Sequence, residues 1–181
     1  MPIAIPVNVR LHRKQGPTMP VLGPEMMAEL ATWLPEASFV LCGDCACATL
    51  AGDHLERTAV VSRMRRDAAL YEPAPPRSGK AGRLRKRGAR LPTPVELAKA
   101  ATGFIEVELD WRGRKLTKLV WSRDVVWYRV CPNALVSLVV VRDPHGHEPD
   151  DFFFTTDLSM SRQRWSRSSP GVGPLRCAVE K

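Results

Sequence analysis

The chain has 181 residues, of which 44% are hydrophobic and 25% are charged. This length suits one domain with a sizeable core, and the composition is ordinary for a soluble globular protein. No apolar run approaches the ~20 residues that a membrane-spanning helix needs. Residues 1–6 also lack the basic start of a secretory signal, so we expect a cytoplasmic protein without a membrane partner.

The first half of the chain predicts alternating strands and helices. Residues 2–11 are rich in Ile and Val and favour a strand. A helix is expected to begin at Gly23 and Pro24 and to end before Pro35, with its apolar residues on one face. The next predicted elements are a buried strand over residues 38–42, a helix over residues 46–55 and a buried strand over residues 58–61. This alternation indicates an α/β layer.

The pattern changes after Ser62. Residues 63–90 are rich in basic residues, Pro and Gly, and predict a long exposed loop. A short helix over residues 94–101 precedes a β-rich region, in which apolar and acidic residues first alternate. The strands expected there cover residues 105–109, 115–121, 125–130, 135–142 and 152–155. Residues 161–181 are expected to be disordered, because they are rich in Arg, Ser, Gly and Pro and have no apolar period.

The formal net charge of +8 is concentrated in one stretch of the chain. Residues 57–90 hold eleven lysines and arginines against Asp67 and Glu72, which gives this stretch a local charge of +9. The rest of the chain is therefore close to neutral. Such a concentration of positive charge is typical of a segment that contacts a polyanion.

Three of the five cysteines, Cys42, Cys45 and Cys47, lie close together in the sequence. A structural zinc site uses about four ligands, usually in two pairs, and no second cysteine pair matches the first. His145 and His147 are separated by one residue in a turn-forming segment, which is a poor spacing for two ligands. We therefore expect reduced thiols that pack as small apolar groups.

Asp44 is the first candidate for a catalytic, metal-binding residue. It follows the buried strand over residues 38–42, and open α/β sheets place their sites at the carboxyl ends of strands. Two Mg²⁺ ions about 4 Å apart can activate a water and stabilise the leaving oxygen of a phosphodiester. The alternative is an aspartate whose side chain caps the helix that follows. Asp157, after the last predicted strand, presents the same two alternatives.

The basic stretch supplies the candidate DNA-binding residues. They are Arg63, Arg65, Arg66, Lys80, Arg83, Arg85, Lys86, Arg87 and Arg90. Each phosphate that they neutralise would release counterions and make binding sensitive to salt. No aromatic residue interleaves with residues 79–90, so stacking on single strands is not expected there. The alternative is a solvated loop without a ligand.

Taken together, several segments resemble the DDE-type transposases of bacterial insertion sequences. The resemblance is to the branch whose RNase H-like domain carries a β-strand insertion. The matching segments, in chain order, are residues 3–14, 40–46, 61–71, 79–92, 139–144 and 155–158. Residues 61–71, the basic segment after the strand of Asp44, are the most specific match.

The resemblance implies an α/β fold, an RNase H-like mixed sheet with a β-rich insertion, truncated at both ends. Residues 1–62 would form a partial core, 63–150 the basic loop and insertion, 151–160 a returning core strand and 161–181 the tail. Asp44 would be the second metal-binding carboxylate, Mg²⁺ the cofactor, and the DNA of insertion-sequence ends the partner. The segment with the first catalytic Asp and the helix with the catalytic Glu are lacking, so we expect DNA binding without strand cutting.

Two other interpretations stay open. In the first, the chain is a non-catalytic nucleic-acid-binding regulator that associates with a full-length transposase or with itself. Specific binding to inverted-repeat ends would favour this interpretation. In the second, the chain is an unrelated metal-dependent nuclease with Asp44 and Asp157 as its carboxylate pair, which metal-dependent cutting would favour.

The tail generates a prediction about the gene. The genetic code allows residues 162–181 to be encoded by codons that also have a meaning in a shifted reading frame. The amino-acid sequence read in that frame resembles the missing helix, including its Arg-Trp pair and its Glu. We therefore expect a frameshift near Ser161. Sequencing the gene and its flanks checks this, and a shifted frame that encodes no Arg-Trp-x-x-Glu would contradict it.

Overall fold

The computed structural model describes residues 8–10, 14–53, 55–76, 85–111, 114–160 and 179–180. Its elements are α1 (Met19–Trp33), β1 (Ser38–Gly43), the 3-10 helix η1 (Cys45–Gly52), β2 (Thr58–Arg63), α2 (Pro94–Ala100), β3 (Ile105–Trp111), β4 (Arg114–Val125), β5 (Val136–Arg142), β6 (Asp151–Thr155) and β7 (Val179–Glu180). The fold is mixed α/β, as expected. None of the helices in these ranges has the length and apolar character needed to cross a membrane.

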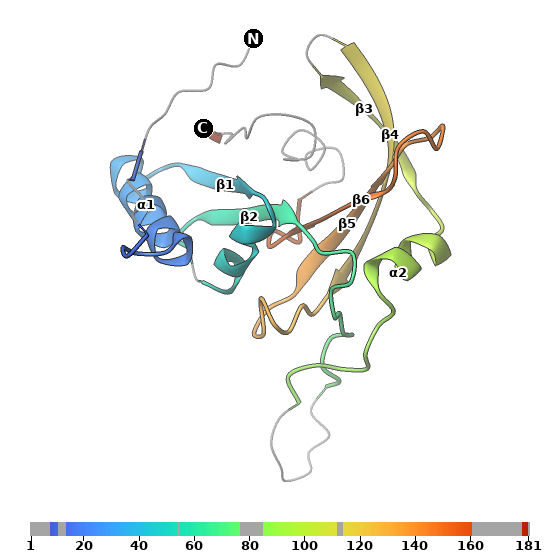
Figure 1. The fold of residues 1–181 in the computed structure, drawn as a ribbon, viewed down its shortest axis with the longest axis horizontal. Helices are drawn as coiled ribbons and strands as arrows, with labels where there is room; N and C mark the ends of the chain where they lie inside the picture. The colour runs from blue at the N-terminus through green and yellow to red at the C-terminus, as the bar shows by residue number, and fades with distance from the viewer. Residues whose placement is uncertain are drawn as a thin grey trace.

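The strands form one mixed sheet in the order β3-β4-β5-β6-β2-β1-β7. β1 and β2 are parallel, with Gly43 opposite Ser62, and η1 belongs to the connection between them. All other neighbouring strands are antiparallel. Figure 1 shows α1 beside β1 at one end of the sheet and the β3–β4 hairpin at the other end.

Alternating side chains divide the core between the two faces of the sheet. In β6, Phe152 and Phe154 belong to the main cluster together with Leu138, whereas Phe153 between them joins a second cluster with Val139. This is the period of two expected for a strand that is buried on both faces. The main cluster also includes apolar residues of η1, of α2 and of the segment that follows β2, so these three segments cover one face.

Most of the predicted elements are confirmed, with boundaries that shift by one or two residues. The predicted strands over residues 38–42, 58–61, 105–109, 135–142 and 152–155 correspond to β1, β2, β3, β5 and β6, and the predicted helix over residues 94–101 corresponds to α2. The strand expected over residues 115–121 is longer and forms β4. α2 has a complete capping box, in which Thr93 and Glu96 bond to each other's backbone N–H.

α1 begins at Met19, ahead of the predicted start at Gly23 and Pro24. Pro20 occupies the first turn, where a missing N–H has little cost. Gly23 allows a close approach to η1, because a Cβ at this position would lie 3.0 Å from Leu50 Cδ1. The Gly-Pro pair therefore marks a contact with η1 inside the helix.

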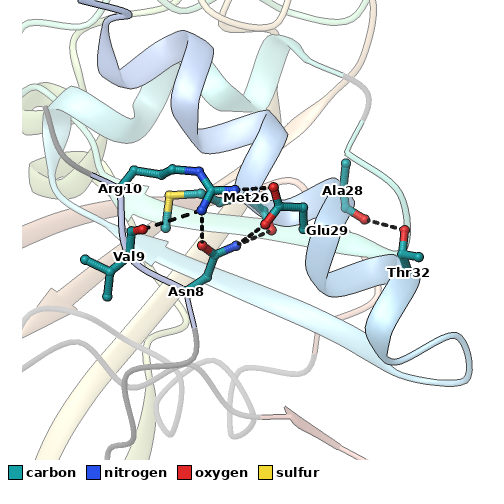
Figure 2. A network of polar contacts seen from close by, with 7 residues as sticks. All are labelled: Asn8, Val9, Arg10, Met26, Ala28, Glu29 and Thr32. Carbon is teal, nitrogen blue, oxygen red and sulfur yellow. Dashed lines mark hydrogen bonds and ion pairs between the residues drawn. The ribbon is translucent and has the colours of Figure 1, made fainter.

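The segment over residues 8–10 is tied to α1 through Glu29 (Figure 2). Asn8 Nδ2 donates to Glu29 Oε2 at 3.0 Å, and the Arg10 guanidinium forms an ion pair with the same carboxylate. Hydrogen bonds from Arg10 and Asn8 lower the pKa of the Glu29 carboxyl. Most of the strand predicted over residues 2–11 lies outside the described residues, and its described part is not a strand.

The strand expected over residues 125–130 does not form. β4 ends at Val125, and the chain then turns, with the backbone N–H of Val130 bonded to the carbonyl of Trp127 at 2.9 Å. Trp127 is buried and packs edge-to-face on Phe154, with ring centroids 5.2 Å apart. The apolar residues of this turn pack into the core. Their composition is typical of a strand and does not indicate a turn.

The tail over residues 161–181 is described only at Val179–Glu180. These two residues form β7 and pair antiparallel with Ser38 and Phe39 of β1, which disagrees with the expected disorder. Pairing of this kind satisfies backbone groups at a sheet edge, which composition does not record. The remainder of the predicted tail lies outside the described residues.

The exposed loop expected over residues 63–90 is only partly confirmed. Met64, Ala68 and Leu70 are buried in the main cluster, with exposed fractions of 3%, 6% and 0%. Arg65, Arg66 and Asp67 lie between the first two of these residues, so the sequence has no continuous apolar pattern here that would indicate burial. The part over residues 77–84 lies outside the described residues.

Backbone hydrogen bonds close this loop where it leaves the core. Glu72 donates its N–H to the carbonyl of Ala89 at 2.9 Å and accepts from the N–H of Gly88 at 2.8 Å. On its other side, Tyr71 exchanges two backbone bonds with Val126, at 2.9 and 3.0 Å. We call residues 71–76, 85–91 and 126–135 the loop base.

Lys118 is the one charged residue that is buried among the described residues. Its Nζ lies 2.6 Å from Glu148 Oε2 and 3.5 Å from Asp143 Oδ1. Burial lowers the pKa of Lys118, but the hydrogen bond to Glu148 and the charges of both carboxylates outweigh this and raise the pKa overall. These ion pairs hold the connection between β5 and β6 against β4.

Replacing Lys118 with Met is expected to lower the free energy of unfolding more than the loss of an exposed ion pair does, because Asp143 and Glu148 lose the charged partner that they share. Urea denaturation followed by tryptophan fluorescence measures the change. The control is Arg65→Met, since Arg65 and its partner Asp67 are 69% and 68% exposed and such pairs contribute little. Equal losses in the two variants would contradict the prediction.

A candidate nucleic-acid interface

Asp44 lies at the carboxyl edge of the β1–β2 pair, between β1 and η1. Its side chain is exposed, and its Oδ1 accepts a hydrogen bond from the backbone N–H of Ala46 at 2.9 Å. The Ser62 hydroxyl, near the end of β2, donates to the Asp44 carbonyl. The capping role considered for Asp44 is therefore confirmed, although the helix that it caps is the 3-10 helix η1 and ends at Gly52.

η1 reaches β1 very closely at Gly43. A Cβ on Gly43 would lie 2.3 Å from Cys47 Cβ and 2.7 Å from Cys47 Sγ, so only glycine fits beneath η1. Burial, followed by the charge of Asp44, raises the pKa of the Cys47 thiol. A thiol with a raised pKa is protonated at neutral pH. The described cysteines form no disulfide bond with one another.

Gly43→Ala is expected to lower the free energy of unfolding by about 2 kcal/mol, because the added methyl group overlaps Cys47. The double variant Gly43→Ala with Cys47→Gly removes the overlapping atoms and leaves Cys47 Cα at 3.8 Å from the new methyl. It should therefore be no less stable than Cys47→Gly alone. A full, additive loss in the double variant, measured by urea denaturation, would contradict the steric explanation.

The carboxylates near Asp44 do not form a magnesium site. β6 runs antiparallel to β2, so Phe153 faces Arg63 at the same edge as Asp44. The backbone N–H of Thr156 bonds to the carbonyl of Val60, so Asp157 lies toward the opposite end of β2 from Arg63 and Asp44. The interpretation of Asp44 and Asp157 as a metal-binding pair is therefore wrong. Within the described ranges, no three His, Cys, Asp or Glu side chains are placed to hold a metal ion, so these residues do not fit the implied Mg²⁺.

Three of the predicted DNA-binding arginines lie at this carboxyl edge and already have partners. The contacts are Arg63 Nη2 to Asp151 Oδ1 (3.7 Å), Arg65 Nη2 to Asp67 Oδ2 (2.8 Å) and Arg66 Nη2 to the carbonyl of Asp150 (3.1 Å). Arg142 also forms a bidentate pair with Asp150. With Asp44 included, four arginines here accompany four aspartates. The edge is therefore formally neutral and attracts phosphate weakly.

The remaining described candidates gather at the loop base, where they are exposed: Arg85, Lys86, Arg87 and Arg90. With Arg129, the loop base has five cationic side chains and one carboxylate, that of Glu72, which gives a local charge of +4. Glu72 Oε1 is itself paired with Arg123 Nη2 at 2.5 Å. The positive charge of the described interface is therefore concentrated here. Lys80 and Arg83 lie outside the described residues.

Two tyrosines that were not predicted lie within this cluster. Arg87 Cζ is 4.1 Å from the ring centroid of Tyr71 and 4.4 Å from that of Tyr128. No aromatic residue interleaves with residues 79–90 in the sequence, but in the structure Arg87 packs against two aromatic rings from other segments. β4 and the turn after it bring Tyr128 to the loop base, and no spacing in the sequence indicates this contact.

An open groove of about 690 Å³ lies in the loop base. Its apolar lining consists of Pro73, Ala74, Val126, Pro132, Ala134 and Leu135, and its polar lining consists of Arg85, Lys86 and Asn133. Lys86 Nζ donates to Asn133 Oδ1 at 3.3 Å. The groove thus combines an apolar surface with two cationic side chains, which suits a flat apolar group attached to an anion.

No family model matches this chain, and no curated protein or solved structure matches it either. The interface is therefore interpreted from its own geometry. It has two parts of different character, a formally neutral carboxyl edge around Asp44 and a cationic loop base with two tyrosines and a groove.

Proposed function

We propose that this chain is a DNA-binding protein related to the DDE-type insertion-sequence transposases, and that it binds DNA through the loop base. The observation that carries the proposal is the net positive charge of the loop base, which has five cationic side chains and one carboxylate. A surface of this charge attracts the phosphate backbone and releases counterions when it binds. The parallel β1–β2 pair, with Asp44 at its carboxyl edge, is compatible with an RNase H-like core.

The proposed activity is binding without strand cutting. A two-ion mechanism needs several carboxylates around one point. Asp44 caps η1, and among the described residues no three His, Cys, Asp or Glu side chains are placed to hold a metal ion. The same observation favours the second candidate function, a regulator that occupies insertion-sequence ends and associates with a full-length transposase or another copy of itself. We propose that the protein acts in the cytoplasm, where cysteines stay reduced, and the described cysteines form no disulfide bond with one another.

The double variant Arg85→Gln with Lys86→Gln is expected to weaken binding to a labelled DNA duplex and to reduce the slope of log K against log salt by about 1 to 2. Fluorescence anisotropy over a salt series measures both quantities. Arg63→Gln with Arg65→Gln is the matched control, because it removes the same charge from the neutral carboxyl edge. A larger loss in the control would place the interface at the edge, and no binding by the unmodified chain would refute the proposal.

The purified chain with Mg²⁺ is expected to leave supercoiled plasmid uncut, because Asp44 alone does not complete a two-ion site. Gel electrophoresis separates supercoiled, nicked and linear forms. Cutting that Asp44→Ala abolishes would overturn this prediction. Asp53→Ala is the matched control, since Asp53 is an exposed carboxylate at the other end of η1.

A further inference from the structure

We infer that the loop base binds single-stranded nucleic acid, with unpaired bases against Tyr128 and in the adjoining groove. The inference rests on the proposed DNA binding and specifies which form of nucleic acid this surface accepts. It depends on three features of the loop base, namely aromatic rings, an apolar groove and cations beside both.

The two tyrosines contact the same arginine. The backbone of Tyr71 is bonded to Val126, and that of its neighbour Glu72 is bonded to Ala89. Arg87 lies against both rings, and both rings are only partly buried. An aromatic ring with a stacked guanidinium is a platform on which the face of a nucleobase packs with little loss of side-chain entropy. In a duplex these base faces are covered by neighbouring base pairs.

The groove supplies the second feature. Its walls include the apolar residues Val126 and Leu135, and its volume of about 690 Å³ is ample for an unpaired base. Asn133 lines it with an amide, which can donate to and accept from the edge of a base. A duplex presents its phosphates, its sugars and the edges of its bases, but the faces of its bases are stacked inside and do not reach an apolar wall.

The cations decide between a nucleic acid and other occupants. Arg85 and Lys86 line the groove itself, so whatever enters it carries negative charge next to its apolar part. A single strand has this character at every nucleotide, with a phosphate beside each base. An acidic peptide matches the charge but has no flat ring at each residue for Tyr128 and the groove.

Fluorescence anisotropy with labelled oligothymidylate and with a duplex of equal length tests the inference on the full chain. The unmodified chain should bind the single strand about tenfold more tightly than the duplex. Tyr128→Leu should remove about tenfold of the single-strand affinity and weaken duplex binding much less, because the cations supply most of the attraction to a duplex. Tyr128→Trp keeps an aromatic face and should retain single-strand binding.

Phe104→Leu is the matched control, because Phe104 also packs against an arginine, with Arg142 Cζ 4.4 Å from its ring centroid, but away from the loop base. It should leave both affinities unchanged. Equal affinity for single strand and duplex, with no effect of Tyr128→Leu, would overturn the inference and leave the proposed DNA binding standing. Competition by polyglutamate as strong as that of oligothymidylate at equal charge would also overturn it. Failure to bind either nucleic acid would overturn both proposals.

Discussion

The pairing of β2 on both of its edges is the constraint on which the rest of the fold depends. Val60, Val61 and Ser62 are at most 1% exposed, so each backbone group of this strand needs a partner within the protein. β1 supplies partners on one edge, in parallel, and β6 supplies them on the other, in antiparallel. Beyond the ladder, Thr156 Oγ1 accepts a hydrogen bond from the Val60 N–H at 2.9 Å. β2 therefore joins β1, on one side, to the antiparallel strands β6, β5, β4 and β3, on the other side, in a single sheet.

Strands buried on both faces were predicted well, because such a strand is a short apolar run between turn residues. β1, β2 and β6 are of this kind, and their positions followed from the sequence to within two residues. Elements that depend on distant contacts were predicted less well. The start of α1 was placed at Gly23, whose small size serves a contact with Leu50, and Trp127 belongs to a turn that packs on Phe154. The neighbouring residues in the sequence do not distinguish a glycine that contacts another element from one that begins a helix, or a tryptophan in a core turn from one in a strand.

The candidate site shows the same division between local and distant information. Arg63, Arg65 and Arg87 look alike in the sequence, and charge alone marked all three as candidates. Arg65 pairs with Asp67, two residues away. The partners of the other two come from elsewhere in the chain, Asp151 for Arg63 and Tyr128 for Arg87, so Arg63 is neutralised and Arg87 is stacked. The charge of each surface follows from these pairings. It was therefore not predictable from the basic stretch by itself.

The closure of the long loop at Glu72, Gly88 and Ala89 has a consequence for how this protein can change. Gly88 is needed for this closure, since a Cβ there would lie 2.6 Å from the carbonyl oxygen of Pro73. Once a loop is closed at its base, each doubling of its length costs only about 0.6 kcal/mol in closure entropy. Insertions and deletions between residues 76 and 85 would thus be tolerated by the sheet. Changes in the length or sequence of this stretch could therefore alter which ligands the protein prefers with little loss of stability.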